Sequence, residues 1–419
     1  MQTVSFGSRR FAVESQSEIP FPSMNMPTEK NCPSCGGTGV SVFYQAQKLP
    51  IHSCQLLETR DEASRFPRRD MALGFCEGCG FISNTIFDPQ VMKYSAGYEE
   101  QQSFSSRFNL FAEDLARQLV DRYNLHDKSL VEIGCGKGDF LATLCELGNN
   151  RGIGVDPSYV PGRLTSPAAD RITFIRDFYS ERYSDLRGDL ICCRHTLEHI
   201  HATKQFVETV RRTIGDESST VVFFEVPDVT RVLREGAFWD LYYEHCSYFT
   251  LGSLARLFRS CRFEVLDLAK AFDDQYLLLE ARPTNKVSTA RFAQEEELEQ
   301  EAKDVACFKL KYRAQFDEWK RRFEAMRSKK QRAAIWGSSS KCVAFLTTLQ
   351  LDEGFDYVVV DINPHRHGKY LPGVAKEILS PRVLQEYRPD TVIPMNPIYC
   401  NEIRQELDGM GLQPEMIAA

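Results

Sequence analysis

The sequence predicts an α/β protein with a small N-terminal zinc-binding domain, a central doubly wound Rossmann-like domain, and a C-terminal Rossmann-like α/β domain after a long helix. Three observations predict this order. Two CxxC pairs lie near the start, an apolar strand runs into a glycine turn at residues 130–141, and a second strand–helix–strand pattern begins near residue 333. Strands that alternate with helices indicate parallel sheets covered by helices on both faces.

Length and composition narrow the class of protein. A chain of 419 residues is long enough for two or three domains with full-sized cores. A net charge of -7 argues against a nucleic-acid partner, because phosphate binding needs a basic surface. The sequence shows no apolar run as long as a membrane span and no signal-peptide pattern at its start. Fourteen cysteines, several within apolar strands, favour a reducing cytoplasm. We therefore expect a cytoplasmic protein that contacts neither membrane nor nucleic acid.

The N-terminal part carries a candidate metal site. Residues 1–29, rich in Ser, Pro and Glu, read as a poorly ordered leader, and the zinc-binding domain is expected over 30–93. Two CxxC turns can supply four thiolates to a closed tetrahedral zinc site, which has a structural role because no position stays open. The separation of the pairs predicts an inserted loop, whose His52 and Cys54 are alternative ligands. Four buried free cysteines are the other interpretation. The predicted zinc ligands are Cys32, Cys35, Cys76 and Cys79.

The central domain, expected over 94–284, opens its sheet with a candidate nucleoside site. Residues 129–133 read as a buried strand, and three glycines at alternate positions allow a tight turn against which a ligand can press. The following helix would point its N–H groups at that ligand. A second strand ends in Asp156, whose carboxylate can accept hydrogen bonds from ribose hydroxyls. The residues of this predicted site are Glu132, Gly134, Gly136 and Asp156.

The glycine spacing is not that of a dinucleotide site. One residue separates Gly136 from Gly138, where the dinucleotide fingerprint has two. Two acids, Glu132 and Asp156, without a cationic clamp favour a positively charged nucleoside over a pyrophosphate. A structural βαβ turn or a nicotinamide site are the alternatives.

Later segments extend this pattern. A helical repeat of apolar residues over 104–123 predicts a helix that leads into the sheet. Tyr98, Gln101 and Gln102 precede it, and ordinary packing is the more conservative interpretation of them. Further strands are expected over 172–178, 189–194, 220–227 and 275–281. Asp177 and Phe178 end the third strand of the sheet, and Arg194 ends the fourth.

His195-Thr-Leu-Glu198-His199 follows the fourth strand directly. As a bare pattern it matches the HxxEH motif of inverted zinc peptidases. However, it starts at the carboxyl end of a sheet strand, where open α/β sheets bind ligands. We therefore expect His195 and Glu198 to line a cleft, and helix capping and packing are the alternative role, above all for His199.

A second chemically dense stretch spans 239–249 and holds two acids, a histidine and several aromatic residues. A carboxylate beside a histidine can set its tautomer and basicity, and a nearby tyrosine can relay a proton or hold an oxyanion. The candidates for this chemistry are Tyr242, Glu244 and His245.

The remaining chain predicts a linking helix and a last domain. Residues 285–332 are charged and glycine-free, with apolar residues stepping by three or four, which predicts one long amphipathic helix. Its aromatic face favours packing on the same chain over a coiled-coil dimer seam. The sequence does not decide between a monomer and a homodimer. Residues 333–419 read as a second α/β domain, in which the Gly337-Ser-Ser-Ser-Lys341 turn could receive an anion but lacks P-loop spacing.

Taken together, residues 32–411 resemble the three-domain, zinc-containing, S-adenosylmethionine-dependent C-methyltransferases that act on keto groups of nucleotide-linked deoxysugars. The resemblance rests on the paired CxxC turns, Val131-Glu-Ile-Gly-Cys-Gly-Lys-Gly138, the YxEHxxYF block over 242–249, and Gly368-Lys-Tyr-Leu-Pro-Gly373. It implies structural zinc and a base machinery of Tyr242 and His245, with Glu244 between them. It also implies S-adenosylmethionine as the cofactor, with a contact set that adds Asp177, Phe178, Arg194 and His195 to the four residues of the glycine-turn site.

Two departures put the sugar-nucleotide acceptor in question. The family commonly has an Asn-Asp pair where this chain has Cys135-Gly-Lys137, and a Gly-Gly-Ser-Leu-Arg run where it has Asp273-Asp-Gln-Tyr-Leu277. We therefore expect C-methylation next to a carbonyl of a small molecule, either sugar-nucleotide-like or from a natural-product pathway. The rivals are methylation of oxygen or nitrogen of a metabolite, a nicotinamide oxidoreductase, and a non-catalytic binding module.

Overall fold

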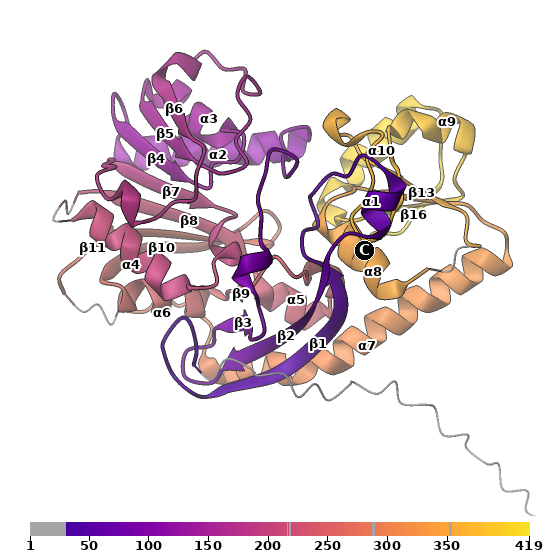
Figure 1. The fold of residues 1–419 in the computed structure, drawn as a ribbon, viewed down its shortest axis with the longest axis horizontal. Coiled ribbons are helices and arrows are strands. Elements are labelled where there is room, and N and C mark those ends of the chain that lie inside the picture. Colours follow the sequence, from indigo (N-terminus) through magenta and orange to yellow (C-terminus); the bar gives the residue numbers. More distant parts are fainter. Residues whose placement is uncertain (1–30, 216, 218, 287–289, 352–353) are drawn as a thin grey trace, which may run out of the picture.

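The computed structural model describes residues 31–215, 217, 219–286, 290–351 and 354–419, so the predicted leader over 1–29 lies outside it. Three sheets organise the chain (Figure 1). A small antiparallel sheet and two larger, mainly parallel sheets follow each other in sequence. This agrees with the predicted α/β class and with the order of its three parts.

The N-terminal sheet has the strand order β1-β2-β3-β9, and its pairings are antiparallel. A long hairpin of β1 (Val40–Pro50) and β2 (Arg68–Cys76) lies between the two cysteine turns, where the spacing had predicted a loop. The short helix α1 (Arg60–Ser64) lies in its connection. β3 (Ile82–Asn84) pairs with β9 (Ser247–Tyr248), which belongs to the YxEHxxYF block. This pairing joins the N-terminal sheet to the candidate site.

The central sheet has the order β10-β11-β8-β7-β4-β5-β6. The strands from β4 to β8 are parallel, and β11 is antiparallel to both of its neighbours. β4 pairs with β5 on one side and β7 on the other, so the strand order reverses there. Ligands of doubly wound sheets bind at the carboxyl ends of strands at such a point. The strands are β4 (Ser129–Ile133), β5 (Arg151–Val155), β6 (Ile172–Ile175), β7 (Leu190–Arg194), β8 (Val221–Pro227), β10 (Phe263–Ala271) and β11 (Tyr276–Pro283).

The helices of the central domain include the predicted lead-in helix, which is confirmed as α2 (Ser106–Tyr123). Its N-cap is Ser105, whose hydroxyl accepts from the N–H of Phe108. The others are α3 (Asp139–Gly148), α4 (Thr203–Ile214), α5 (Val229–Glu235) and α6 (Leu251–Ser260).

The long linking helix is confirmed as α7 (Leu298–Ser328), but it begins later than residue 285. The residues just before α7 contact α6 instead, because Glu295 pairs with Arg259 and Glu296 accepts from the N–H of Gly252. These tertiary contacts override helix propensity. The aromatic face of α7 packs within the same chain, with Phe308 and Trp319 fully buried in its largest apolar core. Figure 1 shows α7 running along one side of the molecule towards the C-terminal domain.

The C-terminal sheet is wholly parallel, with the order β14-β13-β12-β15-β16. Its strands are β12 (Ala333–Trp336), β13 (Tyr357–Val360), β14 (Ile378–Leu379), β15 (Thr391–Pro394) and β16 (Glu415–Met416). Its helices are α8 (Ser340–Leu349), α9 (Leu384–Tyr387) and α10 (Cys400–Gly409). Across the described residues, no helix combines the length and apolar character needed to cross a membrane.

Candidate active site

A cavity of about 1530 Å³ lies between the central and C-terminal domains. The carboxyl ends of β4, β5, β7 and β8 form one side of it. The first turn of α8 and the end of β13 form the other. The segment over residues 94–106, which we call the strap, also lines it at many positions. The cavity is therefore large enough for a nucleoside cofactor together with an acceptor.

The glycine turn follows β4 as predicted. Gly134, Gly136 and Gly138 all have positive φ, at 71°, 55° and 92°, which side chains other than glycine rarely adopt. A Cβ atom on Gly134 would also collide with the hydroxyl of Thr196. Asp156 holds the turn from the end of β5, since its Oδ2 accepts from the N–H of Gly136 at 2.8 Å.

Buried acids line this end of the cavity, and their pKa values are shifted. Burial raises the pKa of Glu132 to about 8, and its Oε2 has no hydrogen-bond partner among the described residues. Burial also raises the pKa of Glu100 to about 7, although the Lys137 ammonium opposes the rise. A buried carboxyl oxygen without a partner is costly. A positively charged ligand at this point would relieve that cost.

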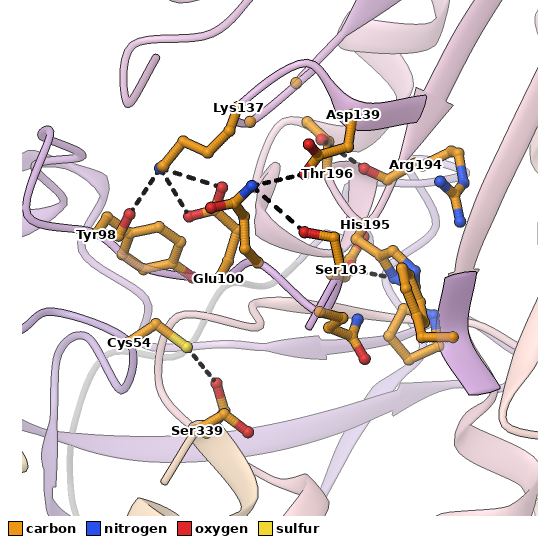
Figure 2. Close-up of a pocket in the computed structure, with 18 of the residues that line it drawn as sticks. Cys54, Tyr98, Glu100, Ser103, Lys137, Asp139, Arg194, His195, Thr196 and Ser339 are labelled. Carbon is orange, nitrogen blue, oxygen red and sulfur yellow. Dashed lines mark hydrogen bonds and ion pairs between the residues drawn. The ribbon is translucent and has the colours of Figure 1, made fainter. Parts of the chain in front are cut away.

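The strap is tied to the glycine turn by Lys137, a residue to which the sequence analysis assigned no role. Its buried ammonium donates to the carbonyl of Tyr98 at 2.9 Å and to both carboxyl oxygens of Glu100 (Figure 2). Gln101 donates to Asp139 at 2.7 Å and also lines the cavity. The sequence did carry a signal for this role of Lys137. A charged residue inside a turn of small residues becomes buried, and a buried charge needs a partner.

The remaining predicted cofactor contacts divide into two groups. Phe178 lines the cavity and is 53% exposed, and Arg194 lines it with its guanidinium held by Glu225 at 2.6 Å. Asp177 does not line the cavity, because its carboxylate accepts hydrogen bonds from the side chains of Tyr183 and Arg182.

His195 and His199 do not converge as an HxxEH zinc pair would. His195 has φ of 47°, and its Nε2 lies 2.9 Å from Glu225 while its Nδ1 lies 3.7 Å from Glu198. Burial alone would lower the pKa of His195, but Glu225 and Glu198 outweigh it and raise the pKa to about 9. His199 lines the same cavity, but its ring lies 4.6 Å from that of His245 and its Nδ1 is 2.9 Å from the hydroxyl of Tyr94. His195 and Glu198 both line the cavity, as the strand-end position predicted.

Tyr242 and His245 lie together in the cavity wall, with ring centroids 4.2 Å apart. Burial lowers the pKa of His245 well below its usual value, and the neighbouring His199, His195 and Lys341 add to this effect. The imidazole is therefore neutral near pH 7, which is the form that can take up a proton.

Glu244 is buried and directed towards the N-terminal part of the chain. Its carboxylate accepts from His52 Nδ1 at 3.1 Å, from the N–H of Ser53 at 2.9 Å and from the hydroxyl of Tyr98 at 3.0 Å. Although it lies between Tyr242 and His245 in sequence, its carboxylate fixes the surrounding elements.

The four cysteines of the two CxxC turns form a compact cluster, whose sulfur atoms all lie within 4.8 Å of one another. Cys32 Sγ lies 3.6 Å from Cys79 Sγ, and Cys35 Sγ lies 3.6 Å from Cys76 Sγ. The alternative ligands lie outside this cluster, since His52 contacts Glu244 and Cys54 Sγ lies 3.3 Å from Ser340 Oγ.

Comparison with known proteins agrees with this arrangement. The profile described as "Methyltransferase domain" matches residues 104–268, and the one described as "C-methyltransferase C-terminal domain" matches residues 278–413. The C-methyltransferase NovU of Streptomyces niveus is 27% identical over 304 residues, covering 68% of this chain and 70% of NovU.

Two solved structures each align with part of the chain. A Burkholderia thailandensis 1,6-didemethyltoxoflavin-N1-methyltransferase aligns with 42% of this chain and 79% of its own, at 20% identity and a TM-score of 0.32. An S-adenosylmethionine-dependent methyltransferase from Aquifex aeolicus covers 42% of this chain and 92% of its own, at 13% identity and a TM-score of 0.34.

The cavity at the strand ends and the matching domain profile define an S-adenosylmethionine-dependent methyltransferase. The C-terminal profile and the NovU relationship specify the class further. Together these findings identify the chain as an S-adenosylmethionine-dependent C-methyltransferase.

Proposed function

We propose that this enzyme methylates a carbon next to a carbonyl group of a small-molecule acceptor, sugar-nucleotide-like or from a natural-product pathway. His245 would serve as the base, and Tyr242 as its proton relay or as the donor to the enolate oxygen. The neutral, buried imidazole of His245, which lies against the ring of Tyr242 in the cavity wall with centroids 4.2 Å apart, carries this proposal. A ketone α proton is weakly acidic, so its removal needs both a placed base and a stabilised oxyanion.

We propose that the glycine-turn end of the cavity holds S-adenosylmethionine. The residues fit a cationic nucleoside, because Glu132 carries an orphaned buried oxygen and a Cβ atom on Gly134 or Gly136 would meet a neighbouring side chain. Asp156 would receive the ribose, and Phe178, Arg194 and His195 line the same space. When bound, the methyl sulfonium supplies an electrophilic methyl group to the acceptor carbon. The protein would contribute mainly alignment and exclusion of water.

We further propose one structural zinc ion at Cys32, Cys35, Cys76 and Cys79. The sulfur–sulfur distances of 3.6 Å support this, since tetrahedral zinc with bonds of about 2.3 Å places its sulfur ligands roughly 3.8 Å apart. The cluster lies in the turns that flank β1 and β2, which favours a folding role.

Product analysis tests the proposed chemistry. With ¹³C-methyl-labelled cofactor and a panel of ketone acceptors, we expect the new methyl on a carbon next to the carbonyl. His245→Ala should lose at least about 10²-fold in kcat, the lower end of general-base contributions, with cofactor affinity unchanged. His126→Ala, at an exposed histidine, is the matched control. A label at a carbon remote from any carbonyl, or a His245→Ala rate near that of the control, would contradict the proposal.

A further inference from the structure

Lys341 brings a cation from the C-terminal domain into the wall of the active-site cavity. It lies in the first turn of α8, and its side chain is only 18% exposed. Its Nζ pairs with Asp240 Oδ1 at 2.5 Å, and Asp240 also accepts from Arg231. One buried carboxylate is thus shared between two cations.

The hydrogen-bonding capacity of Lys341 exceeds what the protein uses. An ammonium group has three N–H donors and no acceptor. Among the described residues, Lys341 has Asp240 as its ion-pair partner. Two donors therefore stay available at the cavity. A buried ammonium with unused donors favours a ligand oxygen, since desolvation without a partner is costly.

The position of this ammonium is fixed relative to the proposed base. Asp240 ends the short helix η5 (Phe238–Asp240), which leads directly into Tyr242. α8 packs on η5 through Phe345, whose ring stacks on that of Phe238 with centroids 5.9 Å apart. Lys341, Tyr242 and His245 all line the same cavity, and the charge of Lys341 acts on the imidazole of His245.

We propose that Lys341 is a catalytic residue, whose ammonium donates a hydrogen bond to the carbonyl oxygen of the acceptor and stabilises the enolate. This deepens the proposed function and rests on it. When His245 takes the α proton, the C–H electron pair forms the enolate double bond and negative charge moves to the carbonyl oxygen. When the α carbon accepts the methyl group, the carbonyl re-forms and the electron pair of the broken C–S bond stays on sulfur. The C-terminal domain thereby completes the active site.

The test compares Lys341→Met with Lys369→Met, which breaks an ion pair between Glu58 and the same C-terminal domain away from the cavity. The acceptor probe is a nucleoside-diphosphate-linked 4-keto-6-deoxyhexose, and single-turnover methylation is measured. Loss of one oxyanion donor typically costs about 10²–10³-fold, so we expect that loss for Lys341→Met and none for Lys369→Met. The cofactor affinity and thermal stability of Lys341→Met should equal those of the control variant Lys369→Met.

Chemical rescue separates catalysis from domain packing. Ethylammonium should restore Lys341→Ala in proportion to its concentration, and Lys341→Arg, which keeps the charge, should retain more activity than Lys341→Met. A Lys341→Met rate near the unsubstituted rate would overturn the proposal. So would a loss that ethylammonium does not restore and that follows reduced thermal stability, because that result indicates packing alone. Methylation of this probe on oxygen or nitrogen by the unsubstituted enzyme would count against the proposed function itself.

Discussion

The imidazole Nδ1 of His52 lies 3.1 Å from the Oε2 of Glu244, although 192 positions separate the two residues. The ring's Nε2 accepts from the N–H of Lys93, which assigns the proton to Nδ1 and makes it the donor to Glu244. This contact joins the N-terminal sheet to the block that carries Tyr242 and His245. The N-terminal part of the chain therefore helps to position the proposed base.

Glu244→Gln is expected to destabilise the fold by about 1–3 kcal/mol. The two carboxylate oxygens of Glu244 accept from three donors, and the NH₂ group of a glutamine cannot accept, so at least one buried donor would lose its partner. Burial would raise the pKa of Glu244, but His52 outweighs it and holds the pKa below its usual value. This carboxylate therefore contributes stability above its unfolded pKa that is lost as the pH falls through its folded pKa. Denaturant titrations should show the difference between the variant and the unsubstituted protein at pH 7 and not in strong acid. An equal difference at both pH values would contradict this account.

Zinc removal should unfold the N-terminal sheet. We expect one zinc per chain, and Cys76→Ser should lower the thermal midpoint while cofactor affinity changes little, because a closed thiolate site contributes folding energy. Cys307→Ser, at an exposed cysteine on α7, is the matched control. Elemental analysis that finds no zinc in freshly purified protein would remove this claim.

The two strand-end acids should differ in their effect on the cofactor. Asp156→Ala should weaken S-adenosylmethionine binding by about 1.5–3 kcal/mol, because ribose hydrogen bonds and the hold on Gly136 are lost together. Asp177→Ala should change it little, since Asp177 contacts Tyr183 and Arg182 instead of the cavity. Calorimetry on both variants checks the pair. Equal losses would show that Asp177 contacts the cofactor after all, as the resemblance implied.

Cofactor affinity should rise with pH because of Glu132. Its raised pKa of about 8 means that the free enzyme carries this carboxyl protonated at pH 7, whereas a cationic ligand favours the ionised form. Binding then releases a proton, so affinity should increase by up to about tenfold per pH unit and level off above pH 8. Glu132→Gln should abolish the rise near pH 8, while Glu100→Gln should preserve it. Calorimetry in buffers of different ionisation enthalpy measures the released proton, and identical heats would refute the idea.

The sequence predicted the helices and strands whose buried residues recur at a regular spacing along the chain. The strand over 129–133 and the α2 repeat were readable because their burial follows a single period in sequence. The start of α7 was misplaced because Glu295 and Glu296 are held by residues of α6, which propensity does not register. The pairing of β3 with β9 depends on contacts across 164 positions and has no local signal.

The candidate site was predictable in its residues but less so in their orientation. Glycines at alternate positions and an acid at the next strand end predict a turn, which the structure shows, and a ribose contact, which stays a prediction. The direction of Glu244 follows instead from His52, and the role of Lys137 follows from the strap that covers it. Lys341 was noted only as part of an anion-binding turn, because its pairing with Asp240 connects two domains.

Exchange of the acceptor's α proton tests the central claim most directly. S-adenosylhomocysteine occupies the cofactor site without a methyl group to transfer, so enolisation can be followed alone in deuterated water by NMR. We expect the unsubstituted enzyme to exchange the α proton, and His245→Ala to exchange it at least about 10²-fold more slowly. Exchange by His245→Ala at the rate of the unsubstituted enzyme would contradict the assignment of His245 as the base.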